Sequence, residues 1–179
     1  MKIHFCILPF ILILVSNTLV GQTNKKTSSF IPLKTGNYWV YALSDDPNKL
    51  DTVKITETKI VNDTDTGYYY DGNLWVVKND SVFQYQSHRG GTEFRTLQYF
   101  PSKSSKIYKV VVQGDILGQR KVSKLKKPYV VKGKKYTNCY RFTQVTPNAD
   151  EVITISKGIG IIEIKNSTRT RSLVSYKIQ

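Results

Sequence analysis

From residue 37 onward, short runs of β-branched and aromatic residues alternate with turn-forming residues. Asp71-Gly72 joins one such run, Tyr68 to Tyr70, to the next, Leu74 to Val77, and an Asp-Gly pair in this position is the strongest local signal for a β-hairpin. Beyond residue 21 no stretch shows a convincing 3.6-residue apolar period. The pattern predicts an all-β antiparallel domain with strands at 37–43, 52–61, 67–70, 74–78, 81–86, 93–100, 107–113, 116–125, 129–132, 136–146, 151–156, 160–165 and 172–178.

This pattern amounts to about a dozen strands, and a sheet of that size must curl, because open twisted sheets rarely exceed roughly ten strands. We therefore expect a single domain with a strongly curved antiparallel sheet, half-barrel or barrel-like, and with little or no helix outside the first 21 residues; a sandwich is the alternative. Such a sheet can hold a small ligand on its concave face. The 12 tyrosines and two tryptophans suit an apolar face with hydrogen-bonding groups. High strand propensity is the alternative reason for their number.

The first 21 residues have the pattern of a secretory signal peptide, with basic Lys2, an apolar run from Ile7 to Val15, and small Gly21 before polar Gln22. An uncleaved N-terminal anchor is the alternative. Because no later apolar run approaches roughly 20 residues, we expect a chain that does not span the membrane after cleavage. The sequence thus predicts an exported protein, periplasmic or extracellular, divided into a signal peptide (1–21), an N-terminal extension (22–36) and a single β domain (37–179).

Positive charge is concentrated in one part of the chain. The sequence has 27 basic and 13 acidic side chains, yet residues 102–135 hold 11 basic residues and one acid, Asp115. This excess predicts an anionic partner, and outside the cytosol a lipid, glycolipid or anionic glycan of the cell envelope would fit. Nucleic acid is not expected, because no recognisable binding motif accompanies the lysines. Solvated strand faces and edges, where lysine discourages edge-to-edge pairing, are the alternative explanation.

The sequence offers little for catalysis. After cleavage one histidine, His88, and one cysteine, Cys139, would remain, so no intramolecular disulfide could form, and we expect Cys139 to be a buried thiol. Most aspartates stand in expected turns, where they have a structural reason to occur. We therefore predict no catalytic residue, no metal site and no cofactor. An enzyme would need His88 to meet a carboxylate such as Asp80 or Glu93 in the folded chain.

Three segments resemble a group of small exported proteins from Bacteroidota. Phe30 to Tyr41 resembles their "FPLxxGNxWxY" opening, Lys132 to Phe142 their "aGtFxNCyxf" strand, and Lys157 to Ile162 their "pGvGlI" turn. The resemblance implies an exported location and a curved antiparallel sheet, similar in outline to periplasmic lipoprotein carriers. Most members have no assigned activity, and the resemblance implies no catalytic residue. Val131-Lys132 stands where the group has proline and alanine, which makes this loop more basic.

These observations favour a non-catalytic binding or carrier module for an amphipathic or anionic molecule of the cell envelope. Its aromatic residues would bury the apolar part and its lysines would pair with the anionic head. The alternative is a structural or interaction protein of the envelope that binds another protein or glycan. The candidate ligand-binding residues are Trp39, Tyr41, Trp75, Tyr85 and Tyr99 for the apolar part, and Lys121, Lys124, Lys126 and Lys127 for the charged part.

Overall fold

The computed structural model describes residues 30–179 except 47, 62–64, 88–92, 113–114 and 146–150. The described residues form 15 strands and no helix, and their strand pairings are antiparallel, which confirms the predicted all-β class. The predicted signal peptide lies outside the described residues.

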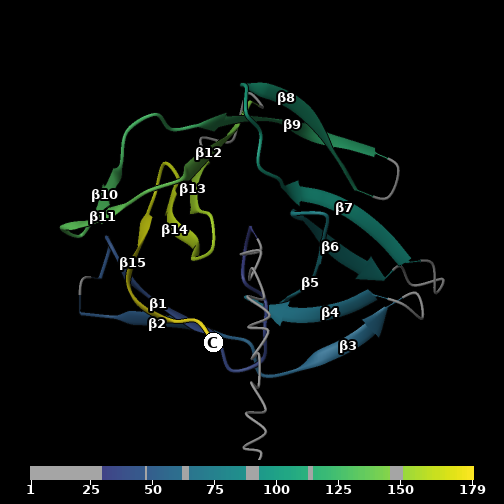
Figure 1. Ribbon diagram of the computed structural model, residues 1–179, viewed down its shortest axis with the longest axis horizontal. Coiled ribbons are helices and arrows are strands. Elements are labelled where there is room, and N and C mark those ends of the chain that lie inside the picture. Colours follow the sequence, from purple (N-terminus) through teal and green to yellow (C-terminus); the bar gives the residue numbers. More distant parts are fainter. Residues whose placement is uncertain (1–29, 47, 62–64, 88–92, 113–114, 146–150) are drawn as a thin grey trace, which may run out of the picture.

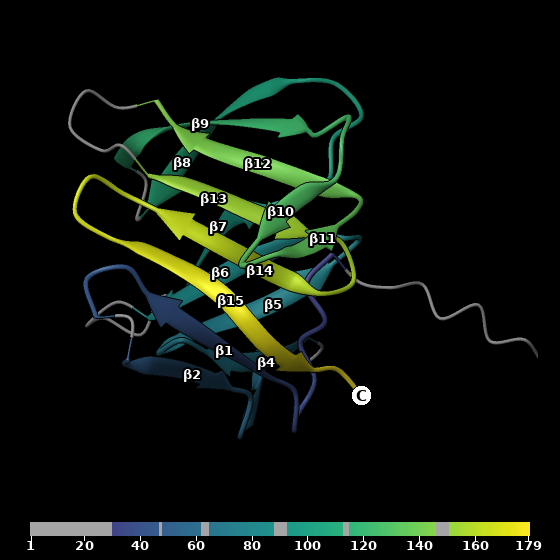
Figure 2. The same cartoon turned by 90° about the vertical axis from the view of Figure 1, so that its left-hand side faces the viewer.

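The strands are distributed over three sheets, which Figures 1 and 2 show from two directions. The eight-stranded sheet has the order β2 (Leu50–Lys54), β1 (Tyr38–Leu43), β15 (Thr170–Lys177), β14 (Gly160–Lys165), β13 (Val152–Ser156), β12 (Cys139–Gln144), β9 (Asp115–Lys124), β8 (Lys106–Val112). The five-stranded sheet has the order β3 (Thr58–Val61), β4 (Asp65–Tyr70), β5 (Asn73–Lys78), β6 (Ser81–Ser87), β7 (Glu93–Tyr99). The third sheet is the hairpin of β10 (Tyr129–Val131) and β11 (Lys134–Tyr136).

Two expected strands are each divided in two, at points where the chain passes from one sheet to another. The strand expected at 52–61 is broken because the chain crosses from the eight-stranded to the five-stranded sheet between β2 and β3. At this crossing the N–H of Ile55, a fully buried residue, donates to the carbonyl of Asn37 at 2.9 Å. The strand expected at 136–146 is broken at Asn138, whose φ of 51° is incompatible with an extended strand. The prediction of continuous strands is wrong at both places.

A continuous chain of aromatic rings connects the two large sheets. Figure 1 shows that these sheets curve around a common interior, and alternate residues of each strand point into it. Neighbouring ring centroids lie 4.7 to 6.0 Å apart, the separation of favourable aromatic pairs. The rings that follow one another in this chain are Trp39, Tyr70, Trp75, Tyr99, Phe142, Phe30 and Tyr140.

The segment at 30–37 runs through this interior, between the two sheets in Figure 1. Phe30 and Ile31 are fully buried, so residues expected to belong to an N-terminal extension form part of the core. The end of the segment is fixed by Asn37, whose Nδ2 donates to the carbonyl of Pro32 at 2.6 Å. Its Oδ1 accepts from the backbone N–H of Gln179 at 3.0 Å. One buried amide therefore joins the start of the described chain to its C-terminal end.

Charged side chains join the two large sheets at their rims. The predicted hairpin at Asp71-Gly72 is confirmed, since both residues have positive φ angles of 51° and 74° between the paired strands β4 and β5. Its Asp71 accepts from Arg171 of β15 at 2.6 Å, and this guanidinium also lies 4.5 Å from the centre of the Tyr41 ring. Lys157 pairs in the same way with Asp80, in the turn after β5.

Replacing Phe30 by alanine should destabilise the fold strongly, because the change removes a ring that contacts Tyr140 and Phe142 in the core. A loss of about 3–5 kcal/mol in the free energy of unfolding is expected for such a truncation. Urea denaturation followed by tryptophan fluorescence measures it. Lys34→Ala, an exposed change in the same segment, is the matched control and should have little effect. Equal stability of the Phe30→Ala variant and the parent protein would show that segment 30–37 does not hold the sheets together.

Candidate functional site

All five predicted aromatic site residues are buried, and four of them share one core cluster. Trp39, Tyr41, Trp75 and Tyr99 are between 0% and 6% exposed and belong to one core cluster. Two of them hydrogen-bond to the backbone with their polar atoms. Trp39 Nε1 donates to the carbonyl of Ile159 at 2.6 Å, and the Tyr41 hydroxyl donates to the carbonyl of Ile161 at 2.9 Å. These rings meet other side chains of the core, and the part of their surface open to a ligand is small.

Tyr85 lies apart from the other four. It packs with Val61 and Val76 in a second, smaller cluster. Since Trp75 and Val76 are consecutive residues of β5, they point to opposite faces of the five-stranded sheet. Tyr85 therefore belongs to the outer face of this sheet, and the five predicted aromatic residues do not share a surface.

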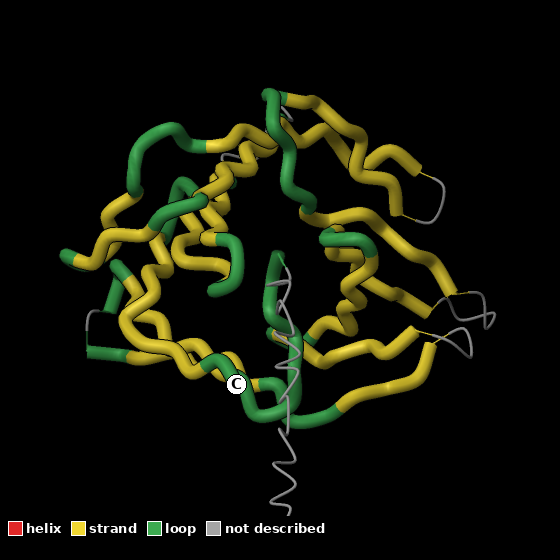
Figure 3. The backbone as a smooth tube through the Cα atoms, viewed as in Figure 1, coloured by secondary structure: helices red, strands yellow, loops and turns green. Residues whose placement is uncertain are grey.

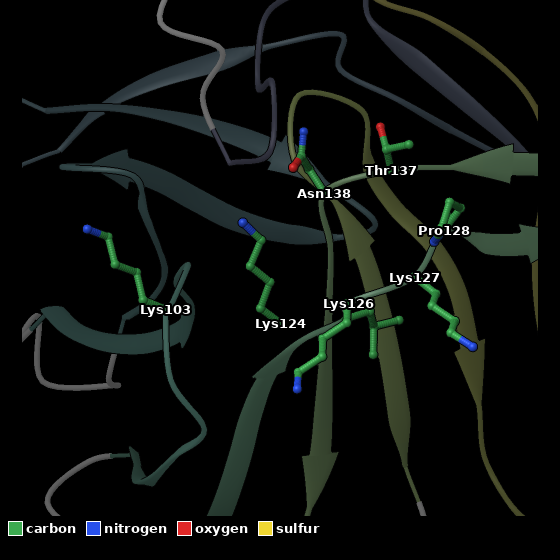
Figure 4. Close-up of a pocket in the computed structure, with 8 residues that line it drawn as sticks. Lys103, Lys124, Lys126, Lys127, Pro128, Thr137 and Asn138 are labelled. Carbon is green, nitrogen blue, oxygen red and sulfur yellow. The ribbon is translucent and has the colours of Figure 1, made fainter.

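Three of the four predicted lysines meet in a surface cleft. The cleft has a volume of about 560 Å³. Figure 4 shows that Lys103 enters it from a different segment than Lys124 and Lys126. We call this the lysine cleft; its lining residues are Lys103, Lys124, Leu125, Lys126, Lys127, Pro128, Thr137 and Asn138.

The lysine cleft lies where the chain changes from one sheet to another. Lys103 belongs to the connection from β7 of the five-stranded sheet to β8 of the eight-stranded sheet. Residues 125–128 lead from β9 into the hairpin of β10 and β11, and residues 137–138 lead from that hairpin to β12. At such connections the chain leaves the regular ladder, so side chains from segments far apart in sequence can surround one space.

Lys124 connects the lysine cleft to the core. Its Nζ lies 5.9 Å from the centre of the Tyr140 ring, within the range of a cation–π contact. Tyr140 is Lys124's partner in the β12–β9 register, and its ring packs edge-on against Phe30 at 5.2 Å. The ammonium of Lys124 thus sits above a ring that cannot move without disturbing the interior.

Lys121 does not line the lysine cleft. Lys121 and Lys124 are three residues apart on β9, so they point to opposite faces of the strand. Lys103, Thr137 and Asn138, which do line the cleft, were not among the predicted residues. Lys103 could have been suspected from its place in the basic segment 102–135, whereas nothing in the sequence brings Thr137 and Asn138 next to it.

Four lysines and no acidic residue line the lysine cleft. Within the described part of the chain, none of the ion pairs involves Lys103, Lys124, Lys126 or Lys127. A second, smaller cleft of about 240 Å³ contains Arg169 and Arg171, but Arg171 there already pairs with Asp51 at 2.6 Å. The lysine cleft is the better candidate for binding an anion, because none of its lysines forms an ion pair with the residues that the structure describes.

The described residues offer little to nucleophilic or metal chemistry. Cys139 is buried, as predicted, and burial raises the pKa of its thiol, which disfavours the reactive thiolate. Among the described residues, no group of three or more His, Cys, Asp or Glu side chains could hold a metal ion. His88, the histidine that an enzyme would need, lies outside the described residues. No helix of the part that the structure describes is long and apolar enough to cross a bilayer.

Comparison with known proteins gives little. No protein-family model matches the chain, and no curated protein matches it. Among solved structures, the chain is similar to a crystal structure of a "putative lipoprotein" from Parabacteroides distasonis ATCC 8503, with 13% sequence identity, 86% of this chain and 100% of that chain covered, and a TM-score of 0.35. We draw no conclusion about function from a similarity at this level.

Alkaline pH should destabilise the protein through its buried tyrosines. Burial raises the pKa of Tyr99 to about 12 and raises those of Tyr41 and Tyr70 further. Because these folded-state pKa values lie above the unfolded value of about 10, the stabilisation is complete below about pH 10 and is lost as the pH rises toward the folded-state values. Urea midpoints measured from pH 8 to 12 should fall above about pH 10, and less so for Tyr99→Phe. A midpoint that rises over this range would contradict the assignment.

Proposed function

We propose that this chain is a non-catalytic binding module of the cell envelope that holds the anionic group of an amphipathic molecule in the lysine cleft. Binding would depend on charge pairing and on burial of apolar surface, and no covalent bond would change. The observation that carries the proposal is that four lysines from two separate segments line one cleft, and that none of them forms an ion pair with the described residues.

The charge of the lysine cleft supports an anionic ligand. Like charges held close together raise the local positive potential, which attracts anions and speeds their association. An anion that binds there would relieve the mutual repulsion of the four ammonium groups. Thr137 and Asn138, at the edge of the same cleft, can add neutral hydrogen bonds to ligand oxygens.

The shape and lining of the lysine cleft support an amphipathic ligand. Its volume of about 560 Å³ falls in the range of small-molecule sites, about 300–1,000 Å³. Leu125 and Pro128 supply apolar surface beside the lysines. Trp39, Tyr41, Trp75 and Tyr99 do not line the cleft; they belong to the same core cluster as Tyr140, which Lys124 contacts. In this proposal the ligand itself is held at the surface.

The alternative function, a structural or interaction protein of the envelope, is favoured by exposed apolar residues on outer strands. Leu50 of β2, Ile60 of β3 and Ile107 of β8 are 58%, 63% and 61% exposed. Each stands on a strand at an edge of its sheet, where another protein could contact it. This alternative places the partner at the sheet edges and leaves the lysine cleft unused.

Native mass spectrometry of the protein isolated gently from its own cell envelope tests the proposal. A stoichiometric anionic lipid or glycolipid adduct is expected. A bare mass, together with a second protein that co-purifies in fixed proportion, would favour the alternative.

A defined probe allows the lysine cleft to be tested by mutation. Dodecyl phosphate, used below its micelle concentration, should bind the protein, and its affinity should fall as salt is added. The double variant Lys124→Gln/Lys126→Gln should bind it about two- to twentyfold more weakly, the effect of removing two exposed charge pairs. Isothermal titration calorimetry measures the affinity. Lys109→Gln, an exposed lysine of β8 in the same basic segment, is the control and should bind normally. Equal losses in the two variants would indicate an effect of net charge and contradict the site.

A further inference from the structure

The hairpin of β10 and β11 forms a basic layer outside the eight-stranded sheet. Figures 1 and 2 both show it on the outer side of β14 and β15. We call residues 126–136 the basic hairpin. It contains five lysines and no acidic residue, and none of the ion pairs of the described residues involves these lysines, which are Lys126, Lys127, Lys132, Lys134 and Lys135.

The two faces of the basic hairpin differ. Val131 and Tyr136 are 2% and 5% exposed and face the sheet. Val130 and Lys135, which are paired across the two strands, face outward, and Val130 is 54% exposed. An apolar side chain therefore stands beside an ammonium group on the outer surface.

The tip of the basic hairpin presents another lysine. Lys132 and Gly133 form the two-residue turn, with φ angles of 47° and 77°. Turns of this kind favour Asn, Asp or Gly at the first position, because φ is positive there. Lysine at this place puts an exposed ammonium at the outermost point of the hairpin.

The basic hairpin is held firmly against the sheet. The hydroxyl of Tyr129 donates to the buried carboxylate of Glu163 on β14, and the guanidinium of Arg141 lies 5.6 Å from the centre of the Tyr129 ring. Lys134 Nζ donates to the carbonyl of Val174 on β15 at 2.7 Å. Glu163 also pairs with Lys165 of the same strand, so its negative charge is balanced within the eight-stranded sheet. The outer face keeps its positive charge on a rigid support.

We propose that the outer face of the basic hairpin docks on the surface of a bilayer that contains anionic lipids. Its lysines attract the anionic head groups, and Val130 enters the head-group region between them. Amphipathic surfaces bind membranes in this way, through apolar area together with basic residues. The charge of this face favours a lipid surface over an apolar protein partner, which would have to desolvate several unpaired ammonium groups.

Docking would also bring the lysine cleft to the membrane. Pro128 and Thr137 stand at the two stems of the hairpin and line the cleft as well. Lys126 and Lys127 belong to both the basic hairpin and the cleft. The outward residues Val130, Lys132 and Lys135, on which the docking proposal depends, do not line the cleft. The membrane proposal therefore does not depend on the proposed ligand of the cleft.

Vesicle flotation tests the docking surface. The protein as isolated from its host should float with vesicles of phosphatidylglycerol and phosphatidylcholine, and much less with phosphatidylcholine alone. Lys132→Gln/Lys135→Gln should weaken binding to the anionic vesicles about 25-fold, since each lysine near such a surface contributes about fivefold. Adding Val130→Ser to this double variant should weaken vesicle binding further. Lys132→Arg/Lys135→Arg, which keeps both charges, should bind the vesicles like the parent protein.

A charge-matched control separates docking from net charge. Lys54→Gln/Lys109→Gln removes two exposed lysines from the two edge strands of the eight-stranded sheet and should bind vesicles normally. Failure of the parent protein to float with anionic vesicles, or equal losses in both double variants, would overturn the proposal. The proposal would also be overturned if the protein bound a soluble acidic polysaccharide but did not bind the vesicles. Unchanged binding of dodecyl phosphate by Lys132→Gln/Lys135→Gln shows that a loss of docking is not a failure of the lysine cleft.

Discussion

The fold depends on aromatic packing between two sheets that are separate hydrogen-bonded units. No disulfide joins the described residues, since Cys139 is a free, buried thiol, so side-chain packing has to hold the sheets together. The chain of rings from Trp39 through Tyr70 to Phe142 crosses the interior from one sheet to the other and back. Phe30 closes this arrangement from the N-terminal segment. Large aromatic side chains suit this task because each buries much apolar area at a low loss of conformational freedom.

Because the rings occupy the interior, the binding that we propose is placed at the surface. In the regular strands the backbone groups pair with neighbouring strands and alternate side chains pack in the core. The connections between the sheets are therefore the places where a binding surface can form. Lys103 comes from one such connection and Lys124 from the last position of β9, where another connection begins, and both line the lysine cleft. Through Tyr140, Lys124 contacts the same core that holds the sheets together. A ligand would thus meet a site of which one side is fixed by the fold.

The sequence predicts the local features of this protein better than the long-range ones. Residue type and alternation indicate which segments are strands. The turn at Asp71-Gly72 could be predicted because these two residue types readily adopt the positive φ angles that a two-residue hairpin turn requires. The breaks near Ile55 and Asn138 could not be predicted, because they arise where the chain changes sheets, which depends on distant partners such as Asn37. The same limit applies to the site. The basic segment is visible in the sequence, and alternation along the strand expected at 116–125 places Lys121 opposite Lys124. Only the fold, however, brings Lys103 to the same cleft as Lys124.

Lysines without partners oppose folding, and this links binding to stability. Among the described residues, the lysines of the lysine cleft and of the basic hairpin form no ion pair, so their like charges repel one another in the folded state, where they are held in one region. In the unfolded chain they can move apart, so the repulsion lowers the free energy of unfolding. An anion or an anionic surface that binds the folded state removes part of this repulsion and stabilises the fold by mass action. If the proposed anionic partner binds, the protein should therefore be more stable with this partner than without it.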